Sequence, residues 1–307
     1  MTRSGARGAR DGLADVVDAL AQAPWPLLVV ADFDGTLAAG SRDPAAAAVD
    51  RVAQRALRRL AAIAAARPAR VHPVILTGRT VEDVAARVRV GGIAYLGDHG
   101  LQSGRLRRRG RLAGLRVTIE PGFEAQRVPA DRLASSVAAV LGAPPWLFVE
   151  RKGPSVAFHV RQAPDVGAAR ALVLDAIARV EASEGIVDHG LAHYRGRSVV
   201  DLRPAAAGGK REAVERLVAS VRPGAIVVLG DELSDVDAFE AVVAARSGGV
   251  LGVTVAVHGA AGPAPAELLA HADHALDSAR QVGRFLWRLA VALDEGGRVN
   301  AGRRRPR

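Results

Sequence analysis

Two aspartates separated by one residue come directly after an apolar stretch of the chain. The stretch is Leu27–Ala31 (LLVVA), and Asp32 and Asp34 follow it within the motif DFDGTL. An uninterrupted apolar run of this length predicts a strand that is buried on both faces. In open α/β sheets ligands bind beyond the carboxyl ends of the strands, so both carboxylates stand where a ligand is expected. Asp-x-Asp-Gly is also ordinary turn chemistry, so the motif alone leaves a purely structural role open.

Three further polar side chains are expected near the same edge of the sheet. Thr77 follows the predicted strand His72–Leu76, and Asp231 follows the predicted strand Ala225–Leu229. Because the carboxyl ends of parallel strands meet at one edge, we expect these side chains to converge with the two aspartates. Asp235 lies in the first turn of the next predicted helix, where an acid is favourable without any function.

The chain's two lysines are conspicuous because the other 40 basic residues are arginines. A general bias towards arginine explains the 40 but not Lys152 and Lys210, where a compact ammonium is a candidate requirement. Lys210 follows Gly208-Gly209 at the predicted start of a helix that continues over residues 211–221. A cation there opposes the helix macrodipole, and it is reasonable where the ammonium and the helix end together hold an anion.

Carboxylates gathered at one sheet edge need a cation. Two carboxylates 4 Å apart repel by about 4 kcal/mol at an effective dielectric constant of about 20, and a bound phosphate would add to the repulsion. Oxygen ligands with open positions for water suit Mg²⁺ rather than Zn²⁺. The absence of cysteine also excludes disulfides, thiol catalysis and cysteine-based zinc sites. The residues therefore predict a magnesium site.

The pattern along the chain predicts two domains. Apolar runs alternate with helical periods over most of the sequence, which is typical of an α/β fold with a doubly wound, largely parallel sheet. Residues 105–204 instead show period-two alternation, with a predicted hairpin of residues 147–152 and 155–161, which indicates an antiparallel sheet with one face on a core. We therefore expect residues 1–104 and 205–307 to form the main domain and residues 105–204 to form a smaller inserted α/β domain.

Capping residues predict where two helices begin. Asp43-Pro44 offers an N-cap followed by a first-turn proline, and the helix expected after it ends at Arg67-Pro68. Thr80 and Asp83 form a capping-box pattern for the next helix.

Composition and charge exclude several classes of protein. With 307 residues and 49% apolar residues, the chain can bury a sizeable core, which excludes wholesale disorder. It has no run of 18 apolar residues and no apolar block of a signal peptide, so we expect a cytoplasmic protein without a membrane partner. Residues 1–10 and 301–307 supply seven of the ten net positive charges, and no aromatic residues interleave with them. Specific binding to nucleic acid is therefore not expected.

The order of these motifs resembles the haloacid dehalogenase superfamily of phosphatases and, within it, the trehalose-6-phosphate phosphatase family. The resemblance covers roughly residues 27–293 and implies a Rossmann-like core with an inserted α/β cap. The similar stretches are LLVVADFDGTLA, VILTGRTVEDV, YLGDHGL, VERKGPSVAFHVRQAP, VVDLRP and VVLGDELSDVDAF.

The resemblance implies a Mg²⁺-dependent phosphatase that converts trehalose 6-phosphate to trehalose and phosphate. Asp32 would attack phosphorus and form an aspartyl-phosphate. Asp34 would protonate the leaving sugar oxygen and then deprotonate the hydrolytic water. Thr77 and Lys210 would hold the phosphoryl oxygens. The ligands of Mg²⁺ would be Asp32, the backbone carbonyl of Asp34, and Asp231, with Asp235 acting through water.

The inserted domain would then be a cap that closes over the sugar. Glu150 and Lys152 are two residues apart on a predicted strand, so they share one face and can bind hydroxyl groups together, or they can form a plain surface pair. The other substrate-binding residues that the resemblance implies are Gly78, Arg79, His99, Gly100, Ser155, His159, Arg161, Asp201 and Arg203.

Two alternatives to trehalose 6-phosphate hydrolysis stay open. Asp201 and Gln102 stand where the family often has a glutamate and an acid, so a related phosphatase acting on another phosphorylated sugar fits the same motifs. The other alternative is a catalytically idle member that serves as a binding module, against which the intact set of motif residues argues. A chain of this length has no room for a sugar-transferase module, so a trehalose-phosphate synthase is expected as a separate partner in the pathway.

Overall fold

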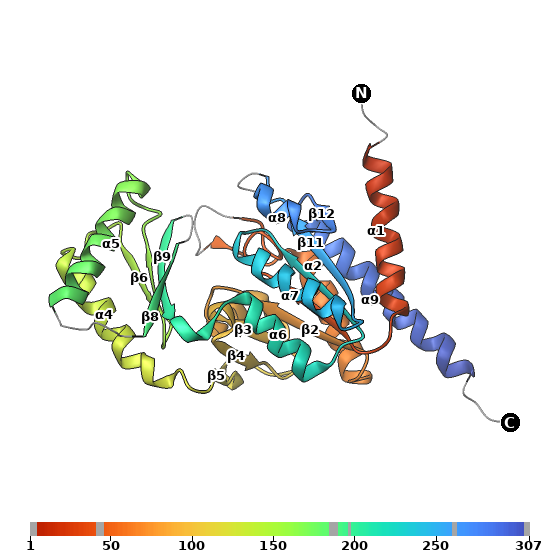
Figure 1. Cartoon of the computed structure of the whole chain (residues 1–307). Helices are drawn as coiled ribbons and strands as arrows, with labels where there is room; N and C mark the ends of the chain where they lie inside the picture. Colours follow the sequence, from red (N-terminus) through yellow and green to blue (C-terminus); the bar gives the residue numbers. More distant parts are fainter. Residues whose placement is uncertain (1–4, 41–45, 184–189, 196–197, 260–262, 304–307) are drawn as a thin grey trace. The chain divides into compact units, whose positions relative to one another are not determined.

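The computed structural model describes residues 5–40, 46–183, 190–195, 198–259 and 263–303 (Figure 1). The chain divides into two compact units, residues 1–118 with 209–307 and residues 119–208. We expected the inserted segment to be residues 105–204. Residues 105–118 fall with the first unit because β4 (Gln102–Arg105) and β5 (Val117–Ile119) belong to its sheet.

The first unit is built on an eight-stranded sheet in the order β12-β11-β10-β1-β2-β3-β4-β5. The strands from β12 to β3 pair in parallel, and β4 joins β3 antiparallel. Ala31 in β1 is level with Leu229 in β10 and with Ile75 in β2, so these three strands end at nearly the same height. The remaining strands are β1 (Leu27–Ala31), β2 (Val71–Leu76), β3 (Ala94–Gly97), β10 (Ala225–Gly230), β11 (Leu251–Val257) and β12 (His274–Leu276).

Helices cover both faces of this sheet, which confirms the predicted doubly wound fold. One core contains alternate residues of β1, such as Leu27 and Val29, packed with α1, α2, α3 and α9. The other core contains Leu28 and Val30, packed with α6, α7 and α8. All five residues of β1 are buried, as its apolar run predicts. The helices are α1 (Gly5–Gln22), α2 (Arg51–Ala66), α3 (Val81–Val88), α6 (Lys210–Val221), α7 (Ser234–Ser247), α8 (Ala266–Ala270) and α9 (Ala279–Arg303).

The observed N-caps correct one predicted helix start and support the other. Helix α2 begins at Arg51, and the carboxylate of Asp50 accepts hydrogen bonds from the backbone of Val52 and Ala53. An aspartate that accepts two backbone N–H groups is a strong N-cap, so the helix starts later than we predicted; Asp43-Pro44 lies outside the described residues. Helix α3 begins after Thr80, whose hydroxyl accepts a hydrogen bond from the backbone N–H of Asp83 as predicted.

The second unit is a four-stranded antiparallel sheet in the order β6-β7-β9-β8, with α4 and α5 packed on one face. The predicted hairpin is present as β6 and β7. Val156 and Phe158 of β7 lie in the core against the helices, so the residues between them face the opposite side of the sheet. The elements are α4 (Arg127–Val140), β6 (Phe148–Arg151), β7 (Val156–His159), α5 (Val166–Ser183), β8 (Leu191–Arg195) and β9 (Val199–Pro204).

Short 3-10 turns complete the connections: η2 (Asp98–Gly100), η3 (Leu112–Gly114), η4 (Glu124–Gln126) and η5 (Ala205–Ala207). Over the part of the chain that the structure describes, none of the helices has both the length and the apolar character needed to cross a membrane.

Candidate active site

Asp32 follows the carboxyl end of β1, which lies between β10 and β2. The backbone N–H of Asp32 donates to the carbonyl of Leu229 at 2.9 Å, which extends the pairing of β1 with β10 by one residue. The Asp32 side chain is buried, whereas the Asp34 side chain is 41% exposed. The two carboxylates of the motif therefore have different surroundings, which suits them to different chemical roles.

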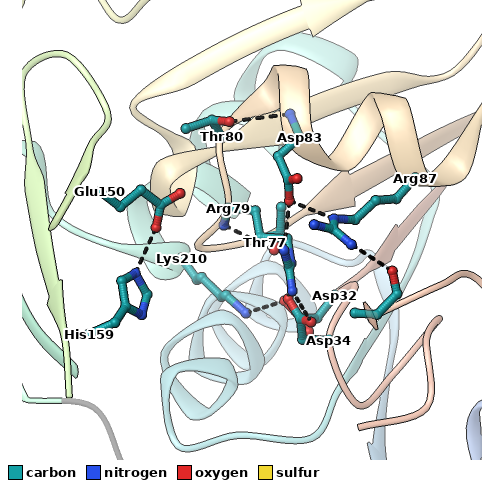
Figure 2. A network of polar contacts seen from close by, with 11 residues as sticks. Asp32, Asp34, Thr77, Arg79, Thr80, Asp83, Arg87, Glu150, His159 and Lys210 are labelled. Atoms are coloured by element: carbon teal, nitrogen blue, oxygen red, sulfur yellow. Dashed lines mark hydrogen bonds and ion pairs between the residues drawn. The ribbon is translucent and has the colours of Figure 1, made fainter. Parts of the chain in front are cut away.

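Lys210, the first residue of α6, joins two of the predicted carboxylates. Its ammonium donates to Asp32 Oδ1 at 2.7 Å (Figure 2) and to Asp235 Oδ1 at 2.7 Å. Burial alone would lower the pKa of Lys210, but the attraction of Asp235 and Asp32 outweighs it and raises that pKa. The ammonium therefore stays charged and can hold an anion at this helix start.

Burial has the opposite effect on the carboxylates. It raises the pKa of Asp32, against the attraction of Lys210, and repulsion from Asp235 adds to the rise. Burial and repulsion from Asp32 and Asp235 raise the pKa of Asp231 to about 9. One ammonium among three carboxylates leaves this corner of the sheet short of positive charge.

The turn after Asp34 fits closely against Asp231. Gly35 has a φ of +80°, and a Cβ built on it would lie 1.9 Å from Asp231 Oδ2, so only glycine fits here. The hydroxyl of buried Thr36 donates to Asp231 Oδ1 at 3.2 Å. The DFDGT motif therefore positions the Asp231 carboxylate as well as supplying two acids of its own.

Asp235 is held by the backbone that precedes it. Its Oδ2 accepts hydrogen bonds from the backbone of Asp231 at 3.0 Å and of Glu232 at 3.1 Å, while its Oδ1 accepts from Lys210. Both oxygens are thus engaged, which fits a residue that acts on a metal indirectly rather than as a direct ligand.

The carboxylate cluster fits a divalent cation. One oxygen from each of Asp32, Asp231 and Asp235 lies within 4.8 Å of the others, and the cluster is all-oxygen. Hard cations such as Mg²⁺ take carboxylate and carbonyl oxygens together with water. A dication would also supply the positive charge that a cluster of three acids and one ammonium lacks.

The loop after β2 lies against the loop after β3. The Thr77 side chain is buried, its hydroxyl accepts from the backbone of Arg79 at 3.3 Å, and its carbonyl accepts from the backbone of His99 at 2.9 Å. A Cβ on Gly78 would lie 2.8 Å from His99 Nε2, so the imidazole lies directly on this glycine. Gly100 packs on α6, where its carbonyl accepts a hydrogen bond from Arg216 at 3.0 Å.

Arg79 pairs with the exposed aspartate of the motif. Its Nε and Nη2 donate to the two oxygens of Asp34 at 2.5 and 2.8 Å (Figure 2). Burial would lower the pKa of Arg79, but its hydrogen bonds to Asp34 and Asp83 raise it. A bidentate pair of this kind fixes the orientation of the carboxylate as well as its charge.

The predicted residues of the second unit form two groups on one face of its sheet. Glu150 pairs in register with Ala157, and Ala157 with Asp201, so Glu150 and Asp201 lie on the face opposite α4 and α5. Glu150 Oε2 lies 2.8 Å from His159 Nε2 (Figure 2). Lys152 Nζ lies 3.4 Å from Asp201 Oδ1.

The second group extends along β9 and β8. Arg203 Nε lies 3.2 Å from Asp201 Oδ2, and the guanidinium stacks 3.7 Å from the centre of the Tyr194 ring. The buried Ser155 accepts at its backbone carbonyl from the Lys152 N–H at 3.0 Å. Arg161 lies apart on the surface, where it donates to Ser198.

The sequence matches the trehalose-phosphatase family over residues 30–265, more than three quarters of the chain. The chain belongs to the trehalose-phosphatase family. Trehalose-phosphate phosphatases of Mycobacterium avium and Mycolicibacterium paratuberculosis are 34% and 35% identical to it over 278 residues. These alignments cover 86% of this chain and 62% of each relative, so the chain spans less than two thirds of the length of these curated relatives.

Solved structures show the same fold at low sequence identity. The C-terminal domain of C. albicans trehalose-6-phosphate phosphatase is 20% identical, with a TM-score of 0.66 over 92% of this chain and 96% of that domain. A haloacid dehalogenase-like hydrolase from Bacteroides thetaiotaomicron is 15% identical, with a TM-score of 0.54 over 87% of this chain and 98% of the hydrolase chain. The Rossmann-like core with a smaller α/β domain is therefore a fold that this chain shares with these solved structures.

The contacts of three further sets of residues in this member of the trehalose-phosphatase family were not predicted from the sequence. Thr36 lies inside the recognised motif, and its hydroxyl could have been proposed as a partner for an acid from a neighbouring strand. Asp83 accepts hydrogen bonds from both Arg79 and Arg87, but an acid and an arginine four residues apart also occur in any exposed helix. Tyr194 carries no signal in the sequence for its stacking on Arg203.

Proposed function

We propose that this chain hydrolyses trehalose 6-phosphate to trehalose and phosphate through an aspartyl-phosphate on Asp32. The observation that carries the proposal is the buried Asp32–Lys210–Asp235 arrangement, which places an acid and a fixed ammonium together at the end of β1. Membership of the trehalose-phosphatase family supports the choice of substrate.

In the first step an Asp32 oxygen forms a bond to phosphorus while the bond from phosphorus to the sugar oxygen breaks. Asp34 gives its proton to the departing oxygen; its carboxylate is exposed enough to reach a ligand and is oriented by Arg79. Lys210 and the Thr77 hydroxyl hold the phosphoryl oxygens as charge moves onto them.

In the second step Asp34 takes a proton from water, whose oxygen bonds to phosphorus and displaces Asp32. Phosphate leaves and Asp32 is restored as a carboxylate. Mg²⁺, held by Asp32, the Asp34 carbonyl and Asp231 with Asp235 behind them, would neutralise the phosphoryl charge when bound.

Residues of the second unit would bind the sugar. Glu150, Lys152, His159, Asp201 and Arg203 share one face of its sheet and offer both donors and acceptors for hydroxyl groups. We further propose that the protein works in the cytoplasm and receives its substrate from a separate trehalose-phosphate synthase.

The test is a panel of sugar phosphates with phosphate release as the readout, in Mg²⁺ and in EDTA. We expect turnover of trehalose 6-phosphate far above that of glucose 6-phosphate, and loss of turnover in EDTA that Mg²⁺ reverses. The Asp32→Asn variant should lose at least about a thousand-fold in kcat while it keeps its fold. Faster phosphate release from sucrose phosphate or glucosylglycerate phosphate would assign the protein to another sugar substrate. If no ester releases phosphate, the chain is better explained as a catalytically idle binding module.

A further inference from the structure

Four side chains of alternating charge run in a line that starts at Asp34 (Figure 2). Arg79 binds both oxygens of Asp34 and donates from its remaining nitrogen, Nη1, to Asp83 Oδ2 at 2.7 Å. Arg87 Nε donates to the same Asp83 oxygen at 2.8 Å, and Arg87 Nη1 donates to the backbone carbonyl of Ala47 at 2.8 Å. The line therefore ends on the backbone beside α2.

Asp34 needs such support because packing does not hold it. Its side chain is 41% exposed, whereas that of Arg79 is 14% exposed and lies over the Phe33 ring. A guanidinium on a flexible stem can pair with a carboxylate in several geometries, and a third contact from the opposite side removes that freedom. Asp83 makes this third contact, and Arg87 holds Asp83.

We propose that Asp83 and Arg87 are positioning residues that fix the Arg79 guanidinium and, through it, the Asp34 carboxylate. The inference rests on the proposed function, in which Asp34 donates a proton to the leaving oxygen and takes one from water. Neither positioning residue touches the reacting atoms.

The local structure of α3 supports this reading of Asp83. In a capping box the acid at this position turns back to the N-cap backbone, but the Asp83 carboxylate accepts from Arg79 and Arg87. Thr80 still caps the helix, and it does so through the backbone N–H of Asp83. Partial burial would raise the pKa of Asp83, but the hydrogen bonds from Arg87 and Arg79 lower it, so the residue is a carboxylate at neutral pH.

The test compares two esters that differ in their need for a proton. A p-nitrophenyl leaving group departs without protonation, whereas an unactivated alkyl group needs it, so a displaced Asp34 slows the alkyl ester selectively. We expect Asp83→Asn to lower kcat for trehalose 6-phosphate, whose leaving group is an unactivated sugar hydroxyl, by about ten-fold more than kcat for p-nitrophenyl phosphate, with little change in KM. Arg87→Gln should act in the same direction and more weakly.

Asp294→Asn is the control, because Asp294 pairs with an arginine outside this line, Arg59, and its side chain is 34% exposed, like that of Asp83. It should leave the ratio of the two kcat values unchanged. Equal losses on both esters in Asp83→Asn would show a merely structural role and overturn the inference, as would an unchanged ratio. If Asp83→Asn does not fold, the ratio of the two kcat values is measured in Arg87→Lys instead. This variant keeps the positive charge but lacks the planar guanidinium. A wild-type protein that hydrolyses neither trehalose 6-phosphate nor p-nitrophenyl phosphate would overturn the proposed function itself.

Discussion

The Lys210 ammonium lies 2.7 Å from Asp32 Oδ1 and 2.7 Å from Asp235 Oδ1, so one cation pairs with two buried acids. The contact joins the end of β1 to the starts of α6 and α7. Because burial makes an unpaired carboxylate costly, each of these groups depends on the other two.

Replacement of Lys210 by Met should therefore affect both stability and activity. We expect a loss of about 3 kcal/mol in the free energy of unfolding at neutral pH, because two buried carboxylates lose their partner, together with loss of phosphate release. Urea unfolding and a phosphate assay measure the two effects. Arg211→Met, at the next and exposed position, should change neither appreciably. Full activity in Lys210→Arg would contradict the requirement for a compact ammonium.

Gly35→Ala should disturb the metal site beyond its effect on the backbone. Gly35 and Gly249 have similar φ values of +80° and +84°. A Cβ on Gly35 would collide with Asp231, whereas a Cβ on Gly249 would have no atom within 4 Å. Gly249→Ala therefore measures the cost of the left-handed backbone alone, which is about 1 kcal/mol. We expect Gly35→Ala to be the more destabilising and to weaken Mg²⁺ binding, measured by thermal shift with added Mg²⁺, at least ten-fold. Equal effects of the two substitutions would show that Asp231 tolerates the contact.

Lys152→Ala should separate sugar binding from phosphate chemistry. If the second unit binds the sugar, the variant should raise KM for trehalose 6-phosphate by about ten-fold and leave hydrolysis of p-nitrophenyl phosphate unchanged, because only the sugar ester needs that site. Arg151→Ala is the control, since Arg151 neighbours Lys152 but binds Asp131 and Ser135 instead. Equal losses on both esters would remove Lys152 from the sugar site.

Asp273 should make stability depend on pH in acid. Burial would raise its pKa, but hydrogen bonds from the backbone and hydroxyl of Thr254, and the charge of Arg246, lower it. A lowered pKa means that the carboxylate stabilises the fold above about pH 4 and that this contribution disappears as the pH falls through the folded value. Asp273→Asn should cost about 1 kcal/mol at pH 7, with allowance for a side chain that is about one third exposed. In urea unfolding at pH 3 the two proteins should differ less; a constant difference at both pH values would contradict the assignment.

The sequence was most informative where one strong local signal fixed an element. The apolar run of β1 predicted a buried strand, and strand ends at one edge predicted the meeting of Asp32 and Asp231. The start of α2 was predicted wrongly because Asp43-Pro44 and Asp50 are both plausible caps, and only the fold decides which one begins the helix.

Contacts between distant side chains could not be predicted in the same way. The local pattern placed Asp235 in a first turn, and the family resemblance gave it a role at the metal through water. Its bond to Lys210 depends instead on the meeting of α6 and α7. The sequence pattern around Asp83 predicted only a helix cap. Its contact with Arg79, which also binds Asp34, forms only in the folded chain. Such roles depend on tertiary neighbours that no local pattern encodes.

Asp32 and its partner Lys210 are 178 residues apart in the sequence. The fold brings them together where β1 lies beside β10. No contiguous fragment confined to the first 200 residues contains both groups, and closing so long a loop is slow compared with forming local helices. Recovery of phosphate release after dilution from denaturant should therefore lag behind the return of helical circular dichroism, which makes turnover a reporter of this long-range contact.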